Sequence, residues 1–348
     1  MTVDIIWKRI PISQSEICLA KVLRCGQTFR WKNINDVWSF ALKDRVVLLK
    51  QDDENIHYSH ILGDNVNQIN NNKTSEETLT FLNDYFNLST NLQLLYDYWI
   101  NQHEIWTKPV KYSPFTEFKG IRIVRQDPWE CLISFICSSN NNVKRISKMC
   151  DNLCQEFGEF VTEYQGRQYH SFPTPQQLAQ PNVEAKLRLL GFGYRAKYIY
   201  QTALKLTDIS KPDISIEKLY KLRDEDYMTA HKFLLQLTGV GPKVADCICL
   251  MALDKHEVVP VDTHVYQIAI RDYKFKGKRD MKSLSKQQYE AIRLYFKQIF
   301  GDYAGWAQSV LFASDLSDLN NGVNQKSEIL ESKHIIEMKA KKTVKVEV

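Results

Sequence analysis

The chain has 348 residues, 44% of them hydrophobic and 25% charged, with a formal net charge of +5 at pH 7. This composition predicts a soluble globular protein with one large or two modest domains. No apolar stretch approaches the roughly 18 residues that cross a bilayer, which excludes an integral membrane protein, and we expect no membrane partner. The N-terminal residues MTVDIIWKRI lack the order of a secretory signal, which predicts an intracellular protein.

Short β-rich segments fill the chain from residue 17 to about residue 62. The segments FRW, VWSFAL, RVVLLKQ and IHYSHIL are separated by polar turns, which predicts an antiparallel sheet. We expect a surface loop in the Asn-rich residues 65–73 and a helix that opens at Ser75. The segment 106–119 contains two prolines and is expected to cross into a second domain.

Helical patterns dominate residues 120–315. A buried helix is predicted after Asp127 and Pro128, and it ends at the polar residues 138–142. Later segments with helical spacing are TPQQLAQ, VEAKLRLL, AKYIYQTALKL, DEDYMTAHKFLLQL and QYEAIRLYFKQIF. We therefore predict an α+β protein with an N-terminal antiparallel sheet domain and flanking helices at 1–118, a helical domain at 119–316 and a flexible basic tail at 317–348.

A tight turn with the sequence Gly-Val-Gly joins two apolar helical segments. Gly239 and Gly241 tolerate the positive φ that such a hairpin demands, and Pro242 suits the first position of the next helix. This arrangement exposes backbone amides together with the positive end of a helix, which is a seat for a phosphate group. For the Gly-x-Gly alone, a simple connector between two core helices explains the sequence equally well.

Lys243 and Asp262 are the candidate catalytic pair. Lys243 stands in the first turn of the helix, where partial desolvation would lower its pKa and make it a usable amine nucleophile, whereas pairing with Asp262 would favour the charged form, and the sequence leaves this balance open. Asp262 follows Val-Pro-Val and can cap the next helix, which is the commoner role for such a residue. A lysine nucleophile beside a carboxylate is also the pair needed to break an N-glycosidic bond and form a Schiff base.

The segments GVGPKVADCICLMALDK and VPVDTH resemble the helix-hairpin-helix superfamily of DNA glycosylases, and within it the eukaryotic 8-oxoguanine DNA glycosylase/AP lyases. The resemblance extends through GQTFRW, FICSSNNN, GFGYRAKY and YAGWAQSVLF, over roughly residues 16–316. Thr238, where the family usually has Pro, and Thr263 depart from the family pattern without removing a reacting group. The resemblance implies a TBP-like N-terminal sheet and a helical domain with the helix-hairpin-helix motif.

No metal or cofactor is expected. The eight cysteines form no Cys-x-x-Cys pair and none follows Cys249, so the iron–sulfur loop of bacterial relatives has no ligands here. In an intracellular protein this pattern favours reduced thiols. The cysteines are Cys18, Cys25, Cys131, Cys137, Cys150, Cys154, Cys247 and Cys249.

The resemblance also implies a pocket for the damaged base. The backbone carbonyl of Gly26 would accept the N7–H that distinguishes oxidised guanine from guanine, and Gln308 would read the Watson–Crick edge. Phe312 and Cys247 would stack on the two faces of the base. Without the resemblance, Gly26 is more often a turn residue, and Phe312 and Cys247 are more often core residues.

A further set of residues is expected to contact DNA. By resemblance, Tyr194 wedges into the duplex, while Arg195, Arg145 and Asn140 hold the orphaned cytosine. For an unknown protein, Tyr194 in the core and Arg195 as a surface charge would be the preferred interpretation. His264 resembles a residue that contacts a phosphate, although a helix-capping or buried histidine explains it nearly as well.

The predicted enzyme is a monomer that acts on double-stranded DNA containing 8-oxoguanine opposite cytosine. It would excise the base with Lys243 and Asp262 and nick the strand by β-elimination. A monofunctional glycosylase for oxidised purines and a non-catalytic helix-hairpin-helix DNA-binding protein are the alternatives. A nuclear location is expected, with the mitochondrion as a second one, and Lys339, Lys341, Lys342 and Lys345 are the candidate nuclear signal beside the alternative of a solvated tail.

Overall fold

The computed structural model describes residues 5–64, 71–107, 113–277, 284–316 and 319, and of residues 71–73 it describes the backbone only. Residues 65–70 of the surface loop predicted at 65–73, and nearly all of the predicted basic tail with its four lysines, lie outside these residues. Among the described residues, no helix is long and apolar enough to cross a membrane.

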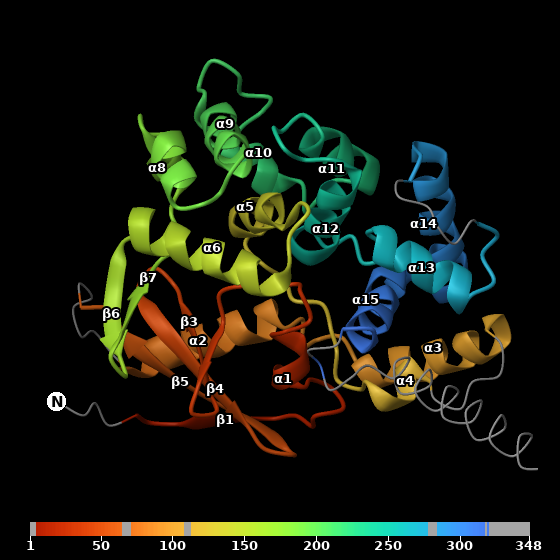
Figure 1. The fold of residues 1–348 in the computed structure, drawn as a ribbon. Helices are drawn as coiled ribbons and strands as arrows, with labels where there is room; N and C mark the ends of the chain where they lie inside the picture. Colours follow the sequence, from red (N-terminus) through yellow and green to blue (C-terminus); the bar gives the residue numbers. More distant parts are fainter. Residues whose placement is uncertain (1–4, 65–70, 108–112, 278–283, 317–318, 320–348) are drawn as a thin grey trace, which may run out of the picture.

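A five-stranded antiparallel sheet forms the N-terminal part, with the strand order β1-β5-β4-β3-β2 (Figure 1). Asn35 and Asp36 both have positive φ in the two-residue turn between β2 and β3, which is the backbone conformation that favours a tight hairpin. The strands are β1 (Lys8–Pro11), β2 (Lys32–Ile34), β3 (Val37–Ala41), β4 (Arg45–Gln51) and β5 (Asn55–Leu62).

Both faces of this sheet are covered. In β4, Val47 and Leu49 belong to a cluster with helix α2 (Asn71–Tyr85), which includes Leu82. Val46 and Leu48 point to the other face and pack against the hairpin of β6 (Phe160–Tyr164) and β7 (Arg167–His170). The near-continuous apolar sequence of β4 therefore reflects burial on two sides.

The remaining elements form a helical part with one extensive apolar core. At its centre lies α5 (Pro128–Ser138), which is buried over most of its length and packs against α6, α9, α10 and α12. The Asp127 side chain caps α5 by accepting the Glu130 N–H, and Pro128 occupies the first turn. The other helices here are α6 (Val143–Phe157), α7 (Pro175–Leu178), α8 (Val183–Leu189), α9 (Arg195–Thr207), α10 (Ile216–Lys221), α11 (Tyr227–Leu234), α12 (Pro242–Ala252), α13 (Thr263–Arg271), α14 (Lys286–Phe300), the 3-10 helix η1 (Gly301–Tyr303) and α15 (Ala304–Ser314).

Two helices from the N-terminal third pack on the helical side rather than on the sheet. Helix α3 (Leu92–Trp106) lies against α14, and α4 (Pro114–Glu117) lies against α15 (Figure 1). Tyr96, Trp99 and Phe115 belong to the helical core, whereas α1 (Leu19–Val22) packs with the sheet. The predicted α+β class is confirmed, and the domain boundary near residue 118 stays a prediction.

Several local predictions were wrong. Helix α2 begins at Asn71 and not at Ser75, so part of the predicted loop is helical. The segment FRW is not a strand, because β2 begins only at Lys32. Strand β1, the β6–β7 hairpin and α10 were not predicted.

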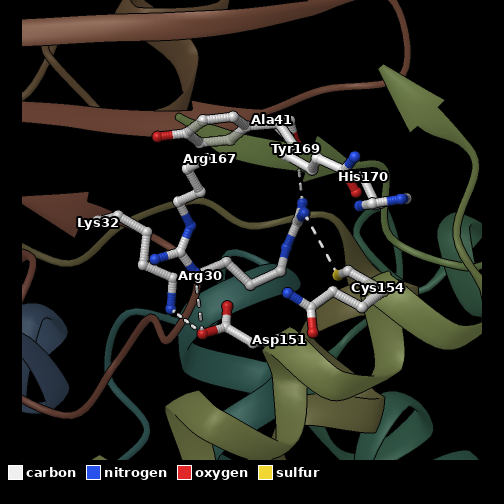
Figure 2. A pocket seen from close by; sticks show the side chains of 10 residues that line it. Arg30, Lys32, Ala41, Asp151, Cys154, Arg167, Tyr169 and His170 are labelled. Carbon is white, nitrogen blue, oxygen red and sulfur yellow. Dashed lines mark hydrogen bonds and ion pairs between the residues drawn. The ribbon is translucent and has the colours of Figure 1, made fainter. Parts of the chain in front are cut away.

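Ion pairs join the sheet to the helical part. Arg30, just before β2, donates from two nitrogens to Glu130 of α5 at 2.8 and 2.9 Å, and the Arg30 side chain is only 6% exposed. Beside this pair, Asp151 of α6 accepts from Lys32 at 2.5 Å and from Arg167 at 3.4 Å (Figure 2). Arg30, Lys32, Asp151 and Arg167 line a cavity of about 30 Å³, which has room for very few waters and none for a base. Paired charges therefore join the sheet to the helical part.

Candidate active site

The helix-hairpin-helix motif consists of α11, a short turn and α12. Gly239 has φ +83°, and a Cβ built there would lie 2.6 Å from the ring of Tyr198. Gly241 caps α12 with φ −93°, and a Cβ there would meet no atom within 4 Å. The prediction of positive φ is therefore right for Gly239 and wrong for Gly241. The open space over Gly241, at the positive end of α12, is suited to a phosphate group.

Lys243 lies in the first turn of α12, with its Nζ 5.4 Å from the centre of the Phe135 ring. Burial lowers the pKa of Lys243, but the thiol of Cys247 and the carboxylate of Asp262 raise it by more, so the net shift is upward. The sequence leaves the balance between burial and pairing with Asp262 open, and in the structure the two partners outweigh the loss of solvation. The amine is therefore charged at neutral pH.

Asp262 is the N-cap of α13, and its side chain accepts the Val265 N–H at 2.9 Å. The capping role is therefore confirmed. The hydrogen bond from Val265 fixes the Asp262 side chain. Its carboxylate is close enough to Lys243 to raise the pKa of the amine. The Asp262 carboxylate therefore both caps α13 and interacts electrostatically with Lys243.

A small cavity of about 50 Å³ lies beside Lys243 and Asp262. The four predicted base-pocket residues all line it, together with both catalytic candidates: Gly26, Cys247, Gln308, Phe312, Lys243 and Asp262. Lys243, Asp262, Gly26 and Phe312 also line a chamber of about 1000 Å³, which extends past residues 138–147. The small cavity has room for a few water molecules, so a purine would enter only if the walls move apart.

The loop that carries Gly26 is held by its neighbour Gln27. The Gln27 amide group donates to the Arg122 carbonyl at 2.9 Å and accepts the Val124 N–H at 2.9 Å, and the residue is 1% exposed. Gly26 has φ +83°, and its Cβ position would be 3.7 Å from Phe312. Sequence reasoning missed Gln27, because its partners lie about a hundred residues further along the chain.

The opposite wall of the cavity comes from α15. Gln308 and Phe312 lie one helical turn apart, and Gln308 is only 5% exposed. The Phe312 ring packs against His264, with 5.1 Å between the ring centres. His264 Nε2 lies 3.0 Å from Asp315 Oδ2, and this bond raises the pKa of His264. His264 thus packs against Phe312 and is itself held by Asp315.

Four of the predicted DNA-contacting residues, Asn140, Arg145, Tyr194 and Arg195, lie together where the α5–α6 turn meets the α8–α9 turn, whereas His264 lies apart from them beside Phe312. The Tyr194 hydroxyl donates to the Ser139 carbonyl at 3.0 Å, and Arg145 donates to the Gly191 carbonyl at 3.3 Å. Tyr194 is 45% exposed, and Asn140 is exposed with φ 48°.

Arg195 differs from its neighbours because it is buried, at 3% exposure. Its guanidinium group donates to the carbonyls of Ser139 and Asn140 and stacks 4.6 Å from the Tyr194 ring centre. The interpretation of Tyr194 as core and Arg195 as surface is therefore the reverse of what the structure has. The exposure of Tyr194 and the burial of Arg195 could not be predicted from the local sequence.

Other residues of the pocket were not predicted from the sequence, although the helical spacing of Met251 could have identified it. Met251 lies one turn beyond Cys247 on the same face of α12 as Lys243, and that spacing places it in the cavity wall. Phe135, Pro260, Val265 and Ser309 line the cavity as well. All eight cysteines are free and buried. In the described part of the chain, no three His, Cys, Asp or Glu side chains gather as metal ligands, and the absence of a cofactor stays a prediction.

Comparisons with known families and with individual proteins show what this chain is similar to. Residues 9–132 match the family described as "8-oxoguanine DNA glycosylase, N-terminal domain", and residues 133–293 match the "HhH-GPD superfamily base excision DNA repair protein" family. An N-glycosylase/DNA lyase of Saccharomyces cerevisiae is 41% identical over 341 residues, covering 88% of this chain and 86% of the relative. The chain belongs to the 8-oxoguanine DNA glycosylase family. The expected enzyme class, a bifunctional N-glycosylase and DNA lyase, is confirmed for this family member.

Further relatives of this glycosylase agree with that assignment. An N-glycosylase/DNA lyase of Arabidopsis thaliana is 36% identical, covering 89% of this chain and 80% of the relative. The solved structure of the Clostridium acetobutylicum 8-oxoguanine glycosylase/lyase, in complex with double-stranded DNA containing cytosine opposite 8-oxoguanine, has a TM-score of 0.70 and 26% identity. That alignment covers 90% of this glycosylase and 97% of the solved chain.

Proposed function

We propose that this glycosylase excises 8-oxoguanine opposite cytosine from duplex DNA and then nicks the abasic strand, with Lys243 as the nucleophile and Asp262 as its electrostatic partner. The observation that carries the proposal is the small cavity lined by this pair and by Gly26, Gln308 and Phe312. The Clostridium acetobutylicum relative, solved with that base pair in DNA, supports the choice of substrate.

The damaged nucleotide must first leave the base stack, because its glycosidic bond is inaccessible inside a duplex. The exposed ring of Tyr194 would fill the gap that remains, and the backbone amides at the start of α12, beside the open space over Gly241, would bind a phosphate of the DNA backbone. Arg195 donates to two carbonyls of its own chain, which fix its guanidinium group, and these bonds use fewer than the five N–H donors of the group, so others can serve the orphaned cytosine.

The flipped base would then be read in the cavity. The N7–H of 8-oxoguanine is a donor where guanine has an acceptor, so the carbonyl of Gly26 would favour the lesion. An unmatched polar pair there costs about 1–3 kcal/mol, which is roughly a 10- to 100-fold preference. Gln308 supplies both a donor and an acceptor for the Watson–Crick edge.

The chemistry needs a neutral amine. Lys243 must lose a proton before it attacks the anomeric carbon, because its pKa is raised in the free protein. The carboxylate of Asp262 then stabilises the positive charge that develops on the sugar as the base departs. The amine forms a Schiff base with the opened sugar, and β-elimination breaks the strand on the 3′ side.

Incision of a duplex with 8-oxoguanine opposite cytosine, combined with borohydride trapping, tests the proposal. We expect Lys243→Gln to abolish both cleavage and the covalent crosslink while DNA binding persists, and Asp262→Asn to slow base release strongly. Duplexes with guanine opposite cytosine, and with 8-oxoguanine opposite adenine, are the controls. Base release without a crosslink in the wild type would indicate the monofunctional alternative, and an intact strand with intact base would indicate a DNA-binding protein only.

We also propose that the protein acts as a monomer in the nucleus, with the mitochondrion as a second location. Sedimentation with and without DNA, and imaging of a fluorescent fusion with the four tail lysines changed, test these two points.

A further inference from the structure

Behind Lys243 lies a buried carboxyl group that the proposed chemistry does not use. Asp246 stands one turn further along α12 and is 0% exposed. The Tyr227 hydroxyl donates to its Oδ1 at 2.8 Å, and the Tyr289 hydroxyl donates to its Oδ2 at 2.5 Å. A buried carboxyl group is tolerated only when such partners satisfy it, so these bonds fix its orientation.

The two tyrosines differ in what else they touch. The Tyr289 hydroxyl also accepts the N–H of Val261 at 3.4 Å. A chain of hydrogen bonds therefore leads from the helix of Lys243 through Tyr289 to the backbone of Val261, the residue directly before Asp262. His231 approaches Asp246 Oδ1 to 3.5 Å and is bonded to the backbone of Pro242, the residue before Lys243.

We propose that Tyr289, held by Asp246, is a positioning residue that sets the carboxylate of Asp262 against the amine of Lys243. This inference rests on the proposed roles of Lys243 and Asp262. The α13 cap fixes Asp262 from its C-terminal side only. On the N-terminal side the chain arrives through apolar residues, and the Val261 N–H bonded to Tyr289 is the polar anchor next to the catalytic carboxylate.

The charged state of the network fits this role. Burial raises the pKa of Asp246 to about 6, so the group is mainly a carboxylate at neutral pH and accepts from both tyrosines. Below that pH the carboxyl group gains a proton and competes as a donor, which weakens the bond from Tyr289. The titratable and charged groups around it are Tyr227 and His231 of α11, Cys247 and Cys249 of α12, and Lys286, Tyr289, Glu290 and Arg293 of α14.

The test compares Tyr289→Phe with Tyr227→Phe. Each variant removes one hydroxyl that donates to Asp246, but only Tyr289→Phe also releases Val261. Under single-turnover conditions with saturating enzyme, we expect Tyr289→Phe to slow base release by about 10- to 100-fold, the range seen when a reacting group is slightly misplaced. Tyr227→Phe should stay within about 3-fold of the wild type. DNA affinity should be unchanged in both variants.

Three further measurements separate positioning from a general loss of stability. The unfolding midpoints of the two variants should fall together, although their rates differ. In an Asp262→Asn background, Tyr289→Phe should cause no further loss, because its effect acts through that carboxylate. Equal rates for the two single variants, or additive losses with Asp262→Asn, would overturn the inference. If Asp262→Asn alone leaves base release unchanged, the proposed function fails instead.

Discussion

Replacing Gly239 by alanine should destabilise the hairpin strongly. Gly239 has φ +83°, and the added methyl group would lie 2.6–2.7 Å from three atoms of Tyr198. A left-handed conformation costs an L-residue about 1–2 kcal/mol, and overpacking of a well-packed contact costs about 1–3 kcal/mol. The free energy of unfolding should therefore fall by about 2–5 kcal/mol, as measured by urea denaturation followed by circular dichroism.

Gly241→Ala is the matched control, because Gly241 has φ −93° and the added methyl group would meet no atom within 4 Å. Its loss of stability should be about 1 kcal/mol or less, the scale of a changed N-cap. Affinity for undamaged duplex should nevertheless fall, because the methyl group occupies the space proposed for a phosphate. If the two variants lose equal stability, or if Gly239→Ala unfolds at the wild-type midpoint, the steric reasoning is refuted.

Two other substitutions test the electrostatics. Cys247→Ala removes a group that raises the pKa of Lys243, so the rise of the single-turnover rate with pH should shift to lower pH, and an unchanged or upward-shifted profile would contradict this. Glu130→Gln leaves the guanidinium of Arg30 buried with a neutral partner, so the free energy of unfolding should fall by about 3–5 kcal/mol, whereas a change below about 1 kcal/mol would show that the pair contributes little.

Features set by neighbouring residues could be predicted from the sequence. The start of α5 at Pro128 and the cap of α13 by Asp262 depend on residues within one turn, and both are confirmed. The β6–β7 hairpin was missed although its turn, Gln165-Gly166, has positive φ at both positions, because the surrounding segments were interpreted as helical.

Features set by distant parts of the chain could not be predicted in this way. Strand β1 is recognisable only by its pairing with β5, some fifty residues later, since Lys8 lies opposite Tyr58. The raised pKa of Lys243 depends on the balance of burial, Cys247 in the same helix and the carboxylate of Asp262 at the start of another helix, and neither the burial nor the position of that carboxylate is set by the local sequence. Burial of Arg195 depends on carbonyls at the end of α5, which the sequence around Arg195 does not reveal.

The two-sided cover of the sheet keeps both faces of strand β4 from contact with nucleic acid. With α2 on one face and the β6–β7 hairpin on the other, strand β4 offers no flat surface on which a double helix could rest. The saddle-shaped surface that a TBP-like sheet would offer to DNA is therefore covered by α2 and the β6–β7 hairpin. Substitutions of Val46 or Val47 should lower the yield of folded enzyme, and the molecules that do fold should recognise damage as well as before.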